Sequence, residues 1–158
     1  MEGFVANVLL VDDEPENACS LALALEHSGH RVYITGDARA AMDLMRRESI
    51  QCLITDYQMP DIDGVQLCLM IRACPRLART PVLMLSAAPE PVEHQQCWSV
   101  FFRKPVCIEE LIEAVDAHVA TRLTVGPRAG ARVSLRAAMR CGVPAASRWA
   151  PVKSACWP

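Results

Sequence analysis

The chain has 158 residues, enough for one ordinary domain but not for a second full domain beside it. Hydrophobic residues make up 52% of it, yet charged residues interrupt every apolar run well before the roughly 18 residues that a membrane span needs. The formal net charge is −2, and the start Met-Glu-Gly-Phe shows no basic region ahead of an apolar one. We therefore expect a cytoplasmic protein without a signal peptide or a membrane partner.

The first half of the chain alternates apolar runs with helical patterns. Residues 8–11 are apolar, and Pro15 suits the first turn of the next helix because its missing N–H would have no partner there. Asp13 or Glu14 is the expected cap, and Ser28-Gly29 ends this helix. The pattern continues with a strand at 31–35, a helix capped by Asp37 and an apolar strand at 50–55.

The second half repeats this alternation with one irregular stretch. A helix is predicted at 64–73 and a strand at 81–85, which Ser86 ends. Pro89 and Pro91 interrupt the short span that follows, so we expect a fourth helix of one or two turns at most. A strand at 100–102 then leads to a final helix whose apolar residues recur at helical spacing, namely Ile108, Leu111, Ile112, Val115 and Val119.

This order of elements predicts an α/β fold, a doubly wound five-stranded parallel sheet whose fourth helix is short or irregular. The strands are apolar at consecutive positions rather than at alternate ones. Such strands favour a sheet that helices cover on both faces.

Charged residues stand where the predicted strands end. Asp12 and Asp13 follow the first strand, Asp56 closes the third and Lys104 follows the fifth. The crevice beyond the carboxyl ends of parallel strands is the usual ligand site, so we expect these four residues to converge there. Three carboxylates in one crevice repel one another unless a cation is present, and magnesium is commonly held by carboxylates together with phosphate oxygens.

The same residues suit the transfer of a phosphoryl group to an acid. Asp56 is a candidate nucleophile, Lys104 would neutralise the anion and the Ser86 hydroxyl would donate to it. Two other interpretations remain, because acids are favoured at any helix N-terminus and a lone lysine is typical of a solvated strand end. A magnesium-dependent phosphatase of the haloacid dehalogenase kind would need an acid two residues after the nucleophile, where this chain has Gln58.

Four stretches of the chain resemble the response regulator receiver domain of two-component signalling. They are Val8-Leu-Leu-Val-Asp-Asp-Glu14, Ile54-Thr-Asp-Tyr-Gln-Met-Pro-Asp-Ile-Asp-Gly64, Val82-Leu-Met-Leu-Ser-Ala87 and Phe101-Phe-Arg-Lys-Pro105. The resemblance implies a flavodoxin-like receiver fold, like that of the chemotaxis regulators, over residues 1–123. It also implies a phosphoacceptor that catalyses only its own phosphotransfer and dephosphorylation, and is otherwise no enzyme.

The resemblance implies a role for each matching residue. Asp56 would accept a phosphoryl group from a phosphohistidine on a histidine kinase or a histidine phosphotransfer protein. Asp13, Asp56 and the Gln58 backbone carbonyl would hold Mg2+, with Asp12 acting through water. Lys104 would pair with the phosphate, and Ser86 would move to hydrogen-bond it. The implied switch and loop residues are Phe101, Pro105 after a cis peptide bond, Met59, Pro60 and Gly64, the last at a position that other residues would strain.

The span between Ser86 and Phe101 departs from the family pattern, because it is shorter than usual and contains Cys97-Trp98. We therefore expect intact phosphorylation chemistry but an altered response toward a downstream protein target. Pairing of two copies, which receiver domains often achieve through this region, would be affected as well. Ala88 offers no polar group to position water, which predicts a moderately long-lived phosphoryl state.

Eight cysteines are scattered along the chain without a Cys-x-x-Cys pair or a spacing typical of zinc sites. Cys19, Cys52 and Cys68 fall among apolar neighbours, where a free cysteine behaves as a small hydrophobe. We expect buried, reduced thiols rather than a metal or redox site.

Charge divides the chain near Leu123. Residues 1–123 hold all 18 acids and 10 of the 16 basic residues, whereas residues 124–158 are basic and rich in alanine, arginine and proline. This tail is too short for a DNA-binding domain with its own core, and we expect it to be disordered. Arg132, Arg136 and Arg140 recur every four residues, so the alternative function is a transcription-related regulator whose tail binds nucleic acid. Signalling through protein contacts is favoured over it.

Overall fold

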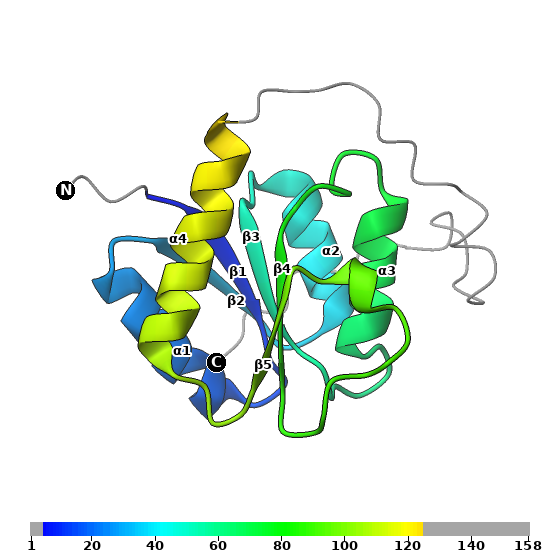
Figure 1. Cartoon of the computed structure of the whole chain (residues 1–158). Helices are drawn as coiled ribbons and strands as arrows, with labels where there is room; N and C mark the ends of the chain where they lie inside the picture. Colours follow the sequence, from blue (N-terminus) through cyan, green and yellow to red (C-terminus); the bar gives the residue numbers. More distant parts are fainter. Residues whose placement is uncertain (1–4, 125–158) are drawn as a thin grey trace.

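The computed structural model describes residues 5–124, with the backbone alone for residues 123 and 124. Five parallel strands form one sheet in the order β2-β1-β3-β4-β5 (Figure 1). In chain order the elements are β1 (Asn7–Val11), α1 (Pro15–His27), β2 (Arg31–Thr35), α2 (Ala38–Arg47), β3 (Cys52–Asp56), α3 (Gly64–Ala73), β4 (Val82–Ser86), the 3-10 helix η1 (Gln95–Cys97), β5 (Val100–Arg103) and α4 (Ile108–Thr124).

Helices cover both faces of the sheet. α1 and α4 lie on one face, and α2, α3 and η1 lie on the other (Figure 1). Successive residues of a strand point to opposite faces, so Leu9 and Leu53 belong to the core under α2 and α3. Leu10 and Ile54 belong to the core under α1 and α4. The predicted doubly wound sheet, buried on both faces, is confirmed.

The first two helices begin where the sequence predicts. Pro15 is the first residue of α1, and the Asp37 side chain caps α2 by accepting a hydrogen bond from the Ala40 N–H at 2.8 Å. Of the two expected caps of α1, Glu14 occupies the N-cap position, but its side chain makes no capping hydrogen bond. That carboxylate instead accepts a hydrogen bond from the Asn17 amide at 2.6 Å.

The fourth crossover is short and irregular, as predicted. Within the described part of the chain, η1 is the only helical turn between β4 and β5. Arg72 of α3 holds this connection in place. Its Nε donates to the Cys97 carbonyl at 2.8 Å, and its Nη1 donates to the carbonyls of Ala78 at 3.0 Å and Thr80 at 2.6 Å.

Burial of the cysteines follows the prediction only in part. Cys52 and Cys68 are buried, but the prediction is wrong for Cys19, which is exposed on α1. Cys19 follows the buried Ala18 on a helix whose inward stripe continues at Ala22, and the next residue of a helix points about 100° away. Its apolar sequence neighbours therefore do not bury it.

The predicted tail, residues 124–158, lies outside the described residues except for Thr124, which ends α4. The expectations for its order and for nucleic-acid binding are therefore untested. Among residues 5–124, no helix is long and apolar enough to cross a membrane.

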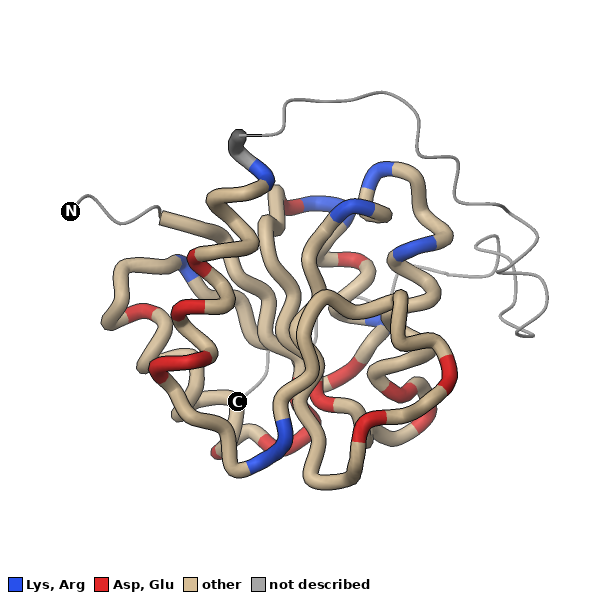
Figure 2. The backbone as a smooth tube through the Cα atoms, in the orientation of Figure 1, with Lys and Arg blue, Asp and Glu red and all other residues tan. Residues whose placement is uncertain are grey.

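Most arginines and many of the acids lie at opposite ends of the parallel strands, although Arg103 and Lys104 lie at the end with the acids (Figure 2). Arginines gather at the edge where β3 and β4 begin, at the end of α2, before β4 and at the end of α4: Arg46, Arg47, Arg76, Arg79 and Arg122. Acids gather at the opposite end, beyond the carboxyl ends of the strands, which we call the acid edge: Asp12, Asp13, Asp56, Asp61 and Asp63.

Candidate functional site

The carboxyl ends of the strands bring the four predicted charged residues together. One carboxylate oxygen from each of Asp12, Asp13 and Asp56 lies within 4.8 Å of the other two. The Lys104 Nζ atom lies 3.2 Å from Asp56 Oδ1 and 3.8 Å from Asp12 Oδ2. Asp56 is the last residue of β3, the central strand, while the other three follow β1 and β5. The convergence predicted from the strand ends is therefore present.

Burial dominates the electrostatics of this cluster. Asp12 is 2% exposed and Asp56 is 7% exposed. Loss of hydration raises the pKa of both carboxyls, since burial disfavours their charged form. The Glu14 backbone N–H and the Lys104 ammonium partly offset this effect at Asp12, and Lys104 with the Tyr57 backbone N–H does so at Asp56. The hydrogen-bond donors and the lysine of the protein thus do not fully offset the cost of burying these carboxylates.

The two carboxylate oxygens of Asp12 differ in their partners. Oδ1 accepts from the Glu14 N–H at 2.9 Å, whereas the buried Oδ2 accepts no hydrogen bond and has only the Lys104 Nζ at 3.8 Å. Burying a carboxylate is costly unless cations or donors approach it closely. Three convergent carboxylates with one lysine between them fit a hard divalent cation that binds oxygen ligands.

Ser86 ends β4, the strand next to the one that carries Asp56. Its side chain is buried, and its Oγ accepts a hydrogen bond from the Ala88 N–H at 3.0 Å. The parallel pairing of β3 with β4 places Leu85 opposite Asp56, so Ser86 stands one residue beyond the level of Asp56. The predicted hydroxyl therefore lies at the same edge of the sheet as the acid cluster.

The loop after β3 returns closely to the strand. The Gly64 N–H donates to the Tyr57 carbonyl at 2.9 Å, and a Cβ at Gly64 would lie 2.4 Å from the Asp56 carbonyl oxygen. Glycine is needed here for this close backbone approach. Of the other predicted loop residues, Met59 is partly buried against the core under α3, while Pro60 and Gln58 are exposed.

Two more predicted residues lie on and just after β5. The peptide bond between Lys104 and Pro105 is cis, as predicted. Phe101 is half-buried, and its ring centroid lies 6.4 Å from that of Trp98 at an interplanar angle of 50°. Trp98 is itself buried, and its Nε1 donates to Glu90 Oε1 at 2.8 Å.

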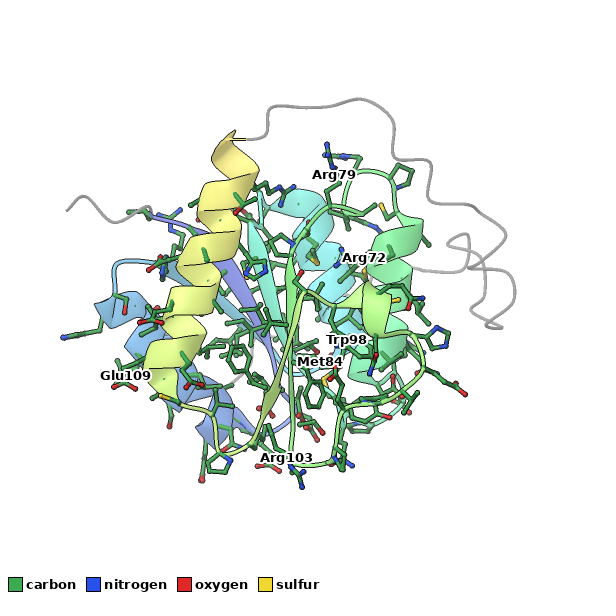
Figure 3. All side chains as sticks on the ribbon, viewed as in Figure 1. Arg72, Arg79, Met84, Trp98, Arg103 and Glu109 are labelled. Carbon is green, nitrogen blue, oxygen red and sulfur yellow. The ribbon has the colours of Figure 1, made fainter. Side chains whose placement is uncertain are left out.

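Sequence reasoning missed the packing of Trp98 and the role of Arg72. In Figure 3 Arg72 projects from α3 and Trp98 lies near the same helix, while Arg103 ends β5 at the acid edge. An arginine near the end of a helix is ordinarily favoured by the helix dipole, so the sequence held no signal for its three backbone acceptors.

Comparison with known proteins identifies the family of this chain. The model of the response regulator receiver domain matches residues 8–116. An uncharacterized 14.6 kDa protein in the sodA1 3′ region of Leptolyngbya boryana is 30% identical over 116 residues, which cover 71% of this chain and 88% of that protein. The sensory/regulatory protein RpfC of Xanthomonas campestris is 29% identical over 134 residues, which cover 80% of this chain but 18% of RpfC.

Solved structures agree with these matches. The signal receiver domain of a signal transduction histidine kinase from Syntrophus aciditrophicus has a TM-score of 0.71 and 25% sequence identity, and the match covers 80% of this chain and 99% of that one. Receiver domains bind magnesium at an acidic pocket, which agrees with the carboxylate cluster found here. The chain belongs to the response regulator receiver domain family of two-component signal transduction.

Proposed function

We propose that this chain is a phosphoacceptor in a two-component phosphorelay. Asp56 would take a phosphoryl group from a phosphohistidine on a histidine kinase or a histidine phosphotransfer protein. The observation that carries this proposal is the 3.2 Å ion pair between Asp56 and Lys104 inside a cluster of three carboxylates. The carboxylate is a suitable nucleophile, and the ammonium is placed to meet the charge of the incoming group.

The transfer exchanges one bond for another. A carboxylate oxygen of Asp56 attacks phosphorus, the phosphorus–nitrogen bond to the partner histidine breaks, and the imidazole leaves with the bonding electrons. Lys104 then pairs with the phosphoryl oxygens in place of the free carboxylate. Ser86 donates its hydroxyl hydrogen to one of these oxygens once its side chain turns toward them.

Asp12, Asp13, Asp56 and the Gln58 carbonyl would hold Mg2+. The buried Oδ2 of Asp12, which accepts no hydrogen bond and lies 3.8 Å from the Lys104 Nζ, and the raised pKa of the buried Asp12 and Asp56 carboxyls support a cation in this cluster. Magnesium bound there supplies positive charge that offsets the phosphoryl oxygens and the carboxylates together.

The acceptor chemistry is tested by incubating the full chain with acetyl phosphate and magnesium. We expect a hydroxylamine-sensitive acyl phosphate on the wild type and none on Asp56→Asn. Asp61→Asn is the matched control, because Asp61 is an exposed acid of the same loop whose φ of 64° asparagine tolerates. Labelling of Asp56→Asn at the wild-type level would refute the proposal.

The response would pass from Ser86 to the β4–β5 connection, which a downstream protein target then contacts. Its support is the chain of neighbours at this place, since Ser86 ends β4, β4 pairs with β5, and Phe101 of β5 contacts Trp98. With Trp149 and Trp157 replaced by phenylalanine, Trp98 is the sole tryptophan. Phosphorylation should then change its fluorescence, and an unchanged spectrum on a phosphorylated chain would contradict this route.

Ala88 supports a phosphoryl state that persists for minutes, because its side chain places no polar group to orient an attacking water. The decay of labelled protein in magnesium buffer measures this lifetime. Loss of the label within seconds would contradict it.

We further propose residues 1–123 as the receiver unit and residues 124–158 as a separate tail.

A further inference from the structure

Two cysteines that are far apart in the sequence meet beneath the β4–β5 connection. Cys68 lies on α3 and Cys97 is the last residue of η1. The Cys68 thiol donates a hydrogen bond to the Cys97 carbonyl oxygen, and its Sγ lies 2.7 Å from that oxygen. Both residues are buried and both thiols are free. The two cysteines are therefore direct neighbours in the fold.

Their surroundings give the two thiols different characters. The hydrogen bond from Cys68 and the charge of Arg72 lower the pKa of Cys97 to about 7, against the opposing effect of burial. The same hydrogen bond and burial raise the pKa of Cys68 well above its ordinary value. Cys52 is buried in the core under α1 and α4. Burial is the main influence on its thiol and raises the pKa to about 12. These influences favour the thiolate form at Cys97 and the thiol form at Cys68, so Cys97 is the better nucleophile and Cys68 is placed as the resolving thiol.

We propose that Cys68 and Cys97 are a redox pair that a peroxide converts into a reversible disulfide. The Cys97 thiolate attacks one peroxide oxygen, the oxygen–oxygen bond breaks, and a sulfenic acid and hydroxide form. The Cys68 sulfur then attacks the Cys97 sulfur, the sulfur–oxygen bond breaks, and the released hydroxide takes the Cys68 proton as water. Two thiols and one hydrogen peroxide thus give one disulfide and two waters, and a dithiol reductant restores the thiols.

The sequence predicts a buried, reduced thiol at Cys68, and the residue is buried and free in the structure. A cysteine among apolar neighbours in sequence gives no sign of a second cysteine 29 residues away in the chain. The pairing depends on the packing of α3 against η1 in the fourth crossover.

The disulfide would tie the β4–β5 connection covalently to α3. Arg72 already holds the Cys97 carbonyl there, and Trp98 is the next residue along the chain. Oxidation would add a covalent bond to a connection that otherwise depends on hydrogen bonds and packing. This consequence requires no phosphorylation, so the proposal stands independently of the proposed function.

Peptide mapping tests the pair directly. The reduced full chain is treated with hydrogen peroxide, alkylated, digested and analysed by mass spectrometry. We expect a Cys68–Cys97 cross-link that dithiothreitol removes, and a loss of two free thiols per chain. Cys52→Ala should keep the cross-link, whereas Cys68→Ala and Cys97→Ala should lose it. A wild-type chain that forms no such cross-link, or that joins either cysteine mainly to another one, would overturn the proposal.

Hydrogen exchange measures whether the bond restrains the connection. We expect the backbone amides of residues 94–98 to exchange at least several-fold more slowly in the oxidised wild type than in the reduced protein. Cys52→Ala should show the same slowing. Equal exchange rates in the cross-linked and reduced chains would contradict the tethering.

Discussion

At the acid edge of the sheet, charged side chains meet in a space that disfavours their charge, whereas hydrogen bonds and packing hold the β4–β5 connection, residues 87–99. Burial raises the pKa of Asp12 and Asp56 at the acid edge. In the connection, the Cys97 carbonyl accepts a hydrogen bond from Arg72 of α3, and the Glu90 carboxylate accepts one from the Trp98 indole. The first region thus holds charged groups at a cost, and the second is held by satisfied polar contacts. Under the proposed function, changes in the acid cluster should affect phosphoryl transfer most, and changes in the connection should affect stability most.

The largest expected effect is at the acid edge. Lys104→Ala should slow phosphoryl transfer from acetyl phosphate by about 100- to 1,000-fold, because it removes the ammonium 3.2 Å from Asp56. The rate of acyl phosphate formation measures it. Arg103→Ala, the exposed neighbour, is the control and should retain the wild-type rate. A slow control would mean that general charge, rather than the placed ammonium, sets the rate.

Arg72→Ala should damage the other region. We expect a free energy of unfolding lower by about 3 kcal/mol in urea denaturation, because three carbonyls lose a charged donor. The exposed Arg76→Ala should change it by less than about 0.5 kcal/mol. The folded variant should still be labelled at Asp56. If labelling falls as it does in Lys104→Ala, the two regions are not separable.

Gly64→Ala tests how closely the loop approaches the acceptor strand. A Cβ at this position would meet the Asp56 carbonyl oxygen at 2.4 Å, so the backbone must shift and the free energy of unfolding should fall by about 1–3 kcal/mol. Gly29→Asn, at a left-handed position with open space around it, should cost less than about 1 kcal/mol. Equal costs for the two variants would refute the close approach as the cause.

Magnesium should stabilise the acid edge more modestly. At a concentration ten times its Kd, it should raise the free energy of unfolding by about 1.4 kcal/mol, since it binds only the folded cluster. Urea denaturation in magnesium and sodium chloride at equal ionic strength measures this. Asp13→Asn should lose most of the gain, while Asp61→Asn should keep it. An equal gain in both variants would place the cation elsewhere.

The acid edge was predictable because its signals are local. Asp12, Asp56 and Lys104 each stand at the end of an apolar run, and parallel strands bring such ends to one edge. The family model and the solved receiver domain confirm the fold that these runs predicted. The roles of the individual site residues stay predictions.

Only the short length of the β4–β5 connection was predictable from the sequence. Pro89 and Pro91 argued against a full helix, but no local pattern indicates that Arg72 donates to three carbonyls or that Cys68 meets Cys97. His30 illustrates the same limit, since it is buried with its Nε2 3.2 Å from Asp116 of α4. Such contacts depend on the packing of whole elements.

The separation of charges between the two edges of the sheet also affects how a partner arrives. We expect a cationic surface to be attracted toward the acid edge, where Arg103 and Lys104 offset part of the carboxylate charge, and to be repelled by the arginines at the opposite end. This orienting field extends only about 10 Å at 0.1 M salt. The association rate should therefore fall with ionic strength, while the transfer within the formed complex keeps its rate.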